Sequence, residues 1–325
     1  MTPGASLLDR VAAGGLLAPG RRVVVLLSGG RDSVCLADLA AAICGVESVR
    51  ALHVNYGLRE ASVAEEAGCR ALCERLGIEL EVVTARPPAA GSGNLQAWAR
   101  DLRYGEGARM AAVHGAVLAA GHTASDQVET ILYRLAASPG RRALLGMPDE
   151  RGRLVRPLLR AGATREETAA WCRSRGLTWS EDASNADGAF ARARVRAAVV
   201  PALRDVHPAA EANVLRTAEL LGDEAQVLDT VVDTALAGRD RIALEHLAGL
   251  PPALGRLVVR RLAEGATGAF CAGAPRRLPD ILALGRDGHA ALDVGDGARA
   301  VVELGVLRFE RTPPLPDERL PSRTP

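Results

Sequence analysis

The chain has 325 residues, of which 48% are hydrophobic, and a formal net charge of +1. This length is enough for a sizeable core and predicts two or three domains. No apolar run approaches the roughly 18 residues of a membrane span, and no leader pattern opens the sequence, so we expect a cytoplasmic protein with no membrane contact. All 40 basic residues are arginine, which excludes the lysine-dependent phosphate loops of kinases and GTPases and the Schiff-base enzymes.

The first predicted strand, residues 22–27, ends in the sequence SGGRDS, and a helix is predicted to follow. Glycines lack Cβ, so the backbone can turn tightly and its amides can approach an anion at the helix N-terminus. Ser28 and Ser33 add hydroxyl donors, and Asp32 can hold a magnesium ion. The segment therefore predicts a phosphate-binding loop, and an ordinary strand-to-helix turn is the alternative.

Three further apolar segments, residues 49–54, 79–84 and 116–121, are each followed by a helical pattern. This alternation is typical of an α/β fold with a parallel sheet, in which ligands bind beyond the carboxyl ends of the strands. Two serine or threonine residues, each three residues before a glutamate, predict capping boxes that start helices, and glycines are predicted to end these helices. The pairs and their glycines are Ser62 with Glu65 and Gly77, and Thr164 with Glu167 and Gly176.

Polar side chains follow the second strand and lie in the next predicted helix. His53 stands at the strand end, where a histidine is more often a hydrogen-bonded scaffold than a catalyst. Arg100 and Arg103 are three residues apart, so they share one helix face. Two guanidinium groups on one face suit a phosphate of ATP or RNA, although they can also be merely solvated.

The fourth strand leads into His122 and a helix with Asp126 and Glu129 at positions i and i+3. This spacing places both carboxylates on one side, at the positive end of the helix dipole. They can bind magnesium or a cationic co-substrate. The alternative is that they only improve the match to the dipole.

Arginine is concentrated between Arg134 and Arg204, where 14 arginines stand against seven acidic residues. This block carries an excess of seven positive charges, and the rest of the chain is negative by six. Such a block can be a solvated surface, but beside an ATP site it indicates a surface that faces RNA.

The second half is predicted to be a helical connector followed by a smaller unit with helices near residues 250–264 and 275–285 and strands around residues 295–297. The six cysteines have no Cys-x-x-Cys pair, and Cys69 and Cys73 are predicted to be core residues rather than a metal or redox pair. The predicted domains are a catalytic domain, a connector, a C-terminal tRNA-recognition domain and a loose tail, at residues 1–205, 206–240, 241–311 and 312–325.

Four motifs in this order, SGGRDS, HVNYGLR, ARDLRY and GHTASDQVET, resemble the successive motifs of the tRNA(Ile)-lysidine synthetase family. The segment 179–201 is similar to the next signature of that family. The resemblance implies the parallel-sheet fold of N-type ATP pyrophosphatases, which is adenine nucleotide alpha hydrolase-like, followed by a small α+β domain. It implies a ligase that uses ATP and Mg²⁺ to attach free L-lysine to the wobble cytidine of tRNA(Ile) with a CAU anticodon, through an adenylated C2 oxygen, with release of AMP and pyrophosphate.

The resemblance also implies roles for individual residues. The catalytic residues would be Asp32, Arg103, His122 and Asp126, with Asp32 as the metal ligand. The ATP site would be formed by Ser28, Gly29, Gly30, Arg31, Asp32, Ser33 and His53. Asp126 and Glu129 would receive the lysine ammonium, and Arg192, Arg194 and Arg196 would contact tRNA. Either a carboxylate or His122 would take the proton that lysine must lose.

The chain departs from the family pattern at Tyr56, Thr123, Ser125 and Ala193, where histidine, histidine, aspartate and asparagine are usual. Two alternatives therefore stay open, a tRNA thiolase of the same superfamily and a catalytically impaired RNA-binding relative. A homodimer is also an expectation.

Overall fold

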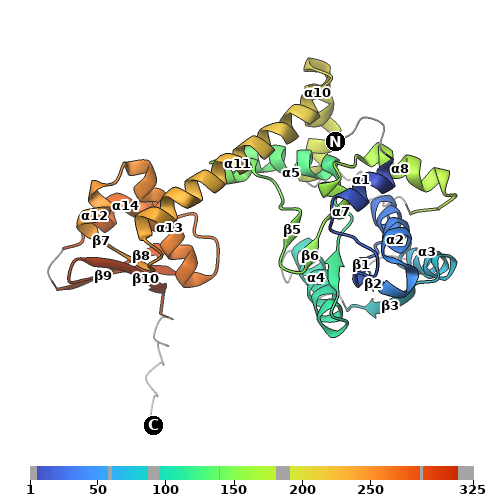
Figure 1. Cartoon of the computed structure of the whole chain (residues 1–325), viewed down its shortest axis with the longest axis horizontal. Helices are drawn as coiled ribbons and strands as arrows, with labels where there is room; N and C mark the ends of the chain where they lie inside the picture. The colour runs from blue at the N-terminus through green and yellow to red at the C-terminus, as the bar shows by residue number, and fades with distance from the viewer. Residues whose placement is uncertain are drawn as a thin grey trace, which may run out of the picture. The chain divides into compact units, whose positions relative to one another are not determined.

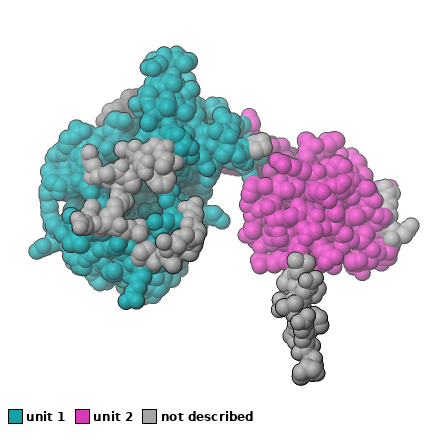
Figure 2. Space-filling view, turned by 180° about the vertical axis from the view of Figure 1, so that it is seen from behind, with its two compact units in different colours: residues 1–221 teal, residues 222–325 magenta. Residues whose placement is uncertain are grey.

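The structure is a computed structural model that describes residues 6–57, 61–86, 95–138, 140–180, 191–285 and 288–313. The predicted tail from residue 314 and the signature residues 181–190 lie outside the described part. Contacts within the chain divide it into two compact units, Met1–Leu221 and Gly222–Pro325 (Figure 2). The bounds of the four predicted domains stay predictions.

The first unit is built on a six-stranded sheet of the predicted α/β class, with the order β3-β2-β1-β4-β6-β5. All neighbouring strands are parallel except β5 and β6. The four predicted strands are confirmed, and two short strands were not predicted. The strands are β1 (Val23–Leu26), β2 (Val49–Asn55), β3 (Glu79–Thr84), β4 (Val117–Ala119), β5 (Glu150–Arg151) and β6 (Leu154–Val155).

Helices cover both faces of this sheet, as parallel strands require. The helices of this unit are α1 (Leu7–Ala13), α2 (Arg31–Cys44), α3 (Ala61–Leu76), α4 (Leu95–Val113), α5 (Ala124–Ala137), α6 (Arg141–Leu144), α7 (Pro157–Arg160), α8 (Arg165–Ser174), α9 (Ala191–Arg194), a π-helical turn (Val195–Val199) and α10 (Val200–Val206). The long helix α11 (Ala210–Leu236) has residues in both units. Alternate residues of β1 enter different cores: Val23 and Val25 pack with α2, and Val24 and Leu26 pack with α4. Figure 1 shows α4 on one side of the sheet and α2 and α3 on the other.

One predicted capping box is confirmed and the other is wrong. Thr164 caps α8 together with Glu167, and Gly176 follows the helix with φ of +62°. Gly77, with φ of +70°, follows α3 as predicted. Ser62 is not an N-cap, because α3 already includes Ala61 and Ser62 lies inside the helix.

The second unit contains an antiparallel sheet with the order β7-β10-β9-β8. Its strands are β7 (Arg241–Ala243), β8 (His289–Gly295), β9 (Ala298–Glu303) and β10 (Val306–Arg311), and its helices are α12 (Leu244–Gly249), α13 (Pro252–Thr267), a 3₁₀ turn (Ala274–Arg277) and α14 (Leu278–Leu282). The strands around residues 295–297 are β8 and β9, as predicted. In the part of the chain that the structure describes, no helix is long and apolar enough to cross a membrane.

Candidate active site

The loop between β1 and α2 has the backbone that a phosphate-binding turn needs. Gly29 has φ of +84°, a conformation that favours glycine, and a Cβ there would lie 3.3 Å from Cys69 Sγ. Gly30 has an extended backbone and forms the N-cap of α2. Among the described residues, no acceptor is bonded to the amides of Arg31 and Asp32. These two N–H groups are therefore available at the positive end of α2.

Serine hydroxyls hold this loop in place. Ser28 N donates to Ser33 Oγ at 3.2 Å, and the two hydroxyl oxygens lie 3.1 Å apart. Ser33 Oγ donates to Gly30 O at 2.8 Å. From outside the loop, Ser180 N donates to Gly29 O at 2.9 Å. The loop is thus preorganised before any ligand binds.

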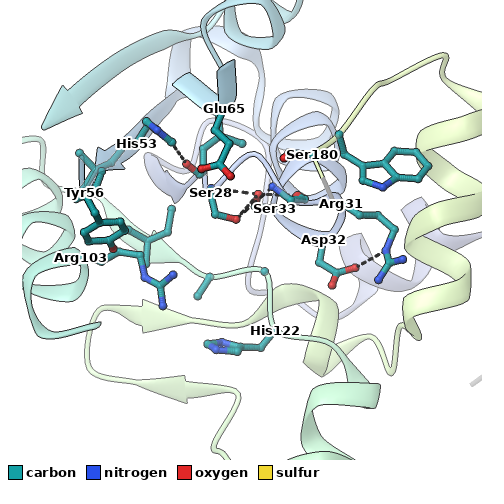
Figure 3. Close-up of a pocket in the computed structure, with 18 of the residues that line it drawn as sticks. Ser28, Arg31, Asp32, Ser33, His53, Tyr56, Glu65, Arg103, His122 and Ser180 are labelled. Atoms are coloured by element: carbon teal, nitrogen blue, oxygen red, sulfur yellow. Dashed lines mark hydrogen bonds and ion pairs between the residues drawn. The ribbon is translucent and has the colours of Figure 1, made fainter. Parts of the chain in front are cut away.

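The loop forms one wall of a cavity of about 730 Å³ at the carboxyl ends of the strands. Figure 3 shows Arg103, His122 and Asp32 around the hollow next to Ser28 and Ser33. Most of the predicted site residues line this cavity: Ser28, Gly30, Arg31, Asp32, Ser33, His53, Arg103, His122, Asp126 and Arg196. Gly29, Glu129, Arg192 and Arg194 are not part of the lining.

Asp32 is a carboxylate at the first turn of α2, and its orientation is fixed by two neighbours. The Thr168 hydroxyl donates to Asp32 Oδ1, and Arg31 Nε donates to the same oxygen at 3.2 Å. Among the described residues, no group of three or more His, Cys, Asp or Glu side chains could hold a metal ion. A single carboxylate beside a phosphate loop fits Mg²⁺, which is usually held by one or two carboxylates, water and substrate phosphates.

Arg103 lines the cavity and carries an unsatisfied donor. Its Nε is buried and has no partner among the described residues, and its guanidinium lies 5.5 Å from the centre of the Tyr104 ring. Arg100 lies 4.9 Å from the same ring. A buried, unpaired guanidinium N–H is costly unless an anion binds to it. The two arginines therefore share the face that the sequence predicted, and that face suits a phosphate.

His53 contacts the backbone at the start of the phosphate loop. Its Nδ1 lies 2.9 Å from Leu27 O and therefore carries the proton, because a carbonyl oxygen can only accept. Cys69 Sγ lies 3.4 Å from the same nitrogen. Both Cys69 and Cys73 are buried in the core, as predicted, and burial raises the pKa of the Cys69 thiol to about 12. This thiol is therefore protonated at neutral pH.

Asp126 and Glu129 lie on one side of α5, as the spacing predicted, but both are engaged by arginines. Arg165 bridges them, with 2.9 Å from Nη2 to Asp126 Oδ1 and 2.9 Å from Nη1 to Glu129 Oε1. Arg196 binds Glu129 with two contacts of 2.7 and 3.0 Å. The Glu129 side chain is only 5% exposed, whereas Asp126 faces the cavity. The two carboxylates are neutralised by the two guanidiniums. Each carboxylate already accepts hydrogen bonds from an arginine in this arrangement.

Three of the four residues that depart from the expected pattern, Thr123, Ser125 and Tyr56, make hydrogen bonds beside the cavity. Thr123 caps α5: its hydroxyl accepts from Asp126 N at 3.3 Å and donates to Asp126 Oδ2 at 2.9 Å. Ser125 Oγ accepts from Arg165 N at 3.2 Å, and the Tyr56 hydroxyl donates to Ala99 O at 3.0 Å. These side chains hold the walls of the cavity together.

Three residues that contact predicted site residues had no sequence signal of their own: Arg156, Arg165 and Thr168. Arg156 donates from Nε to His122 Nδ1 at 3.1 Å. Arg165 and Thr168 lie on the first turns of α8, and only the capping box before them was visible in the sequence. The three arginines predicted to contact tRNA lie on or after α9, and Arg192 Nη2 donates to Thr130 Oγ1 at 3.2 Å.

Replacing Gly121 with alanine should destabilise the fold by about 1–3 kcal/mol, the range of overpacking, and weaken ATP binding. A Cβ at Gly121 would lie 3.0 Å from the Asp32 carbonyl carbon and oxygen and 3.1 Å from Ser33 N, so α2 must shift. Chemical unfolding and ATP titration measure both effects. The matched control is Gly68→Ala in α3, where nothing lies within 4 Å and alanine should be neutral or stabilising. If the two variants have equal stability and equal affinity for ATP, Gly121 does not lie as close to the backbone of α2 as the structure indicates.

Comparisons with known proteins agree with this geometry. The PP-loop domain family matches residues 7–203. A protein of Symbiobacterium thermophilum named tRNA(Ile)-lysidine synthase is 37% identical over 95% of this chain and 70% of its own length. Proteins with the same name from Leifsonia xyli and Pseudomonas putida are 36% and 37% identical, and the matches cover 90% and 70% of this chain and 91% and 57% of those proteins. The match covers 48% of a Thermus thermophilus relative, so the chain spans only about half the length of some relatives.

Among solved structures, the chain is similar to the U34-tRNA thiolase NcsA from Methanococcus maripaludis, which is described with its [4Fe-4S] cluster. The TM-score is 0.55 at 18% identity, over 66% of this chain and 78% of that chain. This similarity shows the fold alone.

Proposed function

Because the chain belongs to the tRNA(Ile)-lysidine synthase family of PP-loop proteins, we propose that it attaches lysine to the wobble cytidine of tRNA(Ile) with a CAU anticodon. The observation that carries the proposal is the preorganised SGGRDS loop facing Arg103, His122 and Asp126 across one cavity. The loop can bind the phosphates of ATP, and the carboxylate on the other side of the cavity can bind the ammonium of lysine.

ATP binds with its phosphates on the loop. The amides of Arg31 and Asp32 and the Ser28 hydroxyl bind the phosphate oxygens, and Arg103, which lines the cavity, binds the α-phosphate with its guanidinium. Ser33 supports the loop through its bonds with Ser28 N and Gly30 O. Asp32 would hold Mg²⁺, which neutralises phosphate charge when bound. His53 acts on ATP indirectly, by fixing the carbonyl of Leu27 at the start of the loop.

The reaction proceeds in two displacements. The C2 oxygen of the cytidine attacks the α-phosphorus of ATP and pyrophosphate leaves, which forms an adenylated cytidine. The lysine ε-amine then attacks C2 and AMP leaves with the oxygen. An ammonium cannot attack, so it first loses a proton to a carboxylate of the site or to water.

Asp126 and Glu129 are the proposed lysine ligands. Asp126 faces the cavity and can exchange its contact with Arg165 for one with an ammonium. Glu129 lies deeper and is bonded to two arginines, so it holds the arrangement together. Arg192, Arg194 and Arg196 and the surrounding basic block are proposed to contact the phosphates of tRNA. The homodimer and the cytoplasmic location stay predictions.

The test is an assay of the purified chain with ATP, labelled lysine and unmodified tRNA(Ile). We expect pyrophosphate release that depends on tRNA and label transfer to the tRNA that depends on lysine. A tRNA with uridine at the wobble position is the matched control and should accept no label. Dependence on a sulfur donor instead of lysine would indicate a thiolase, and absence of turnover would indicate an inactive RNA-binding relative; either result contradicts the proposal.

A further inference from the structure

His122 has its two ring nitrogens in different environments. The ring lines the cavity on the side opposite Ser28 (Figure 3). Its Nδ1 lies 3.1 Å from Nε of Arg156, a residue that is only 5% exposed. A guanidinium has five N–H donors and no acceptor, so the nitrogen that faces Arg156 must present a lone pair. The imidazole is therefore neutral, and its one proton is on Nε2.

Arg156 is held rigidly enough to impose this choice. It follows β6 directly, its backbone N donates to Asp149 O at 2.8 Å, and its Nη1 donates to Pro148 O at 2.6 Å. These contacts leave Nε directed at His122. A buried guanidinium with fixed contacts cannot turn away to let Nδ1 take up a proton.

The charges around the ring act in the same direction. Burial is the largest cause and lowers the pKa of His122 to about 4. This value already includes the neighbouring guanidiniums of Arg156, Arg103 and Arg100, which also lower the pKa, and the Asp126 carboxylate, which raises it. The ring therefore stays neutral through the physiological range.

We infer that Arg156 is a positioning residue that fixes His122 as an Nε2–H hydrogen-bond donor, so that His122 binds a phosphate oxygen of the nucleotide and does not act as a general base. The inference rests on the proposed function for the identity of the anion. It excludes His122 as the acceptor of the lysine proton, because Nδ1 presents its lone pair to Arg156 and Nε2 already carries a proton. That proton goes to Asp126 or to water.

The direct test is ¹⁵N NMR of the full chain labelled at histidine, with His122 assigned by the loss of its signals in H122Q. We expect a protonated Nε2 and an unprotonated Nδ1 from pH 8 down to about pH 5. Observation of the Nδ1–H tautomer, or titration near pH 6.5, would overturn the inference. This readout needs no substrate, so it is independent of whether the chain makes lysidine.

The Arg156→Met variant tests the cause. Loss of the donor and its charge should allow both tautomers and raise the pKa of His122. The matched control is Arg153→Met, which removes an arginine of the same segment that donates to Ala116 O and does not line the cavity. It should leave His122 unchanged. If R156M folds and His122 keeps its tautomer and its pKa, Arg156 does not position the ring. If R156M does not fold, the inference is tested by the tautomer of His122 in the unmutated chain.

Kinetics separate a donor from a base. Gln places an N–H near the position of Nε2, so H122Q should keep about tenfold more single-turnover pyrophosphate release than H122A. In the unmutated enzyme, protonation of His122 should cause no fall in the rate of pyrophosphate release between pH 7 and pH 5. Equal rates for the two variants, or an acidic limb near pH 6.5 that disappears in H122Q, would contradict the donor role.

Discussion

Replacing Asp32 with asparagine should slow ATP-dependent pyrophosphate release by about 10²- to 10³-fold, the usual loss when a preorganised electrostatic group is removed. Asparagine keeps the oxygen that accepts from Thr168 and Arg31, so the side chain should hold its place. The change removes only the negative charge with which Asp32 would hold Mg²⁺ beside the phosphates. Single-turnover release with saturating tRNA measures the effect.

A buried aspartate on the same helix provides the control. Asp38 Oδ2 accepts from Trp171 Nε1 at 2.9 Å and from Arg175 Nε at 3.2 Å, away from the cavity. Asp38→Asn should cost about 1 kcal/mol of stability, the net worth of one hydrogen bond, and leave pyrophosphate release nearly unchanged. If D32N releases pyrophosphate at the rate of D38N, Asp32 has no role at the phosphates.

The sheet and the phosphate loop could be predicted because their signals are local. The four parallel strands appear as apolar segments separated by helical patterns, and the sequence SGGRDS carries its own turn chemistry. The strands β5 and β6 were missed because each has only two residues, which is too short for a periodic pattern. The start of α3 was placed too late, because a serine three residues before a glutamate can also occur inside a helix.

The site was predicted in outline but not in its contacts. The i, i+3 spacing correctly placed Asp126 and Glu129 on one side of a helix. It did not reveal that Arg165, 36 residues after Glu129, lies between them. Within a block of 14 arginines, nothing distinguishes Arg156 or Arg165 from arginines on a solvated surface. Which charge pairs with which is set by the bonds between the first residues of α5 and the first residue of α8, and the sequence pattern of one helix contains no information about the other.

The second large effect is expected for Glu129. Glu129→Gln should lower the free energy of unfolding by about 2–4 kcal/mol, because it leaves Arg165 and Arg196 without their shared carboxylate. This figure is reduced from the 3–5 kcal/mol of a fully buried pair, since the arginine side chains are 20% and 35% exposed. Denaturant unfolding gives the value. Glu219→Gln, at an exposed pair with Arg216, is the control and should change it by less than about 0.5 kcal/mol.

The same variant tests the acidic pair as the lysine site. In E129Q, one negative charge is lost from a cluster that was balanced, so the cluster becomes positive and repels an ammonium. The lysine KM should therefore rise by at least tenfold, while the ATP KM changes by less than threefold, because the phosphate loop is untouched. Asp126→Asn should shift the lysine KM in the same direction with a smaller loss of stability, since its carboxylate already faces the cavity. Equal increases in the KM for lysine and for ATP would mean that the pair holds the fold and does not bind lysine.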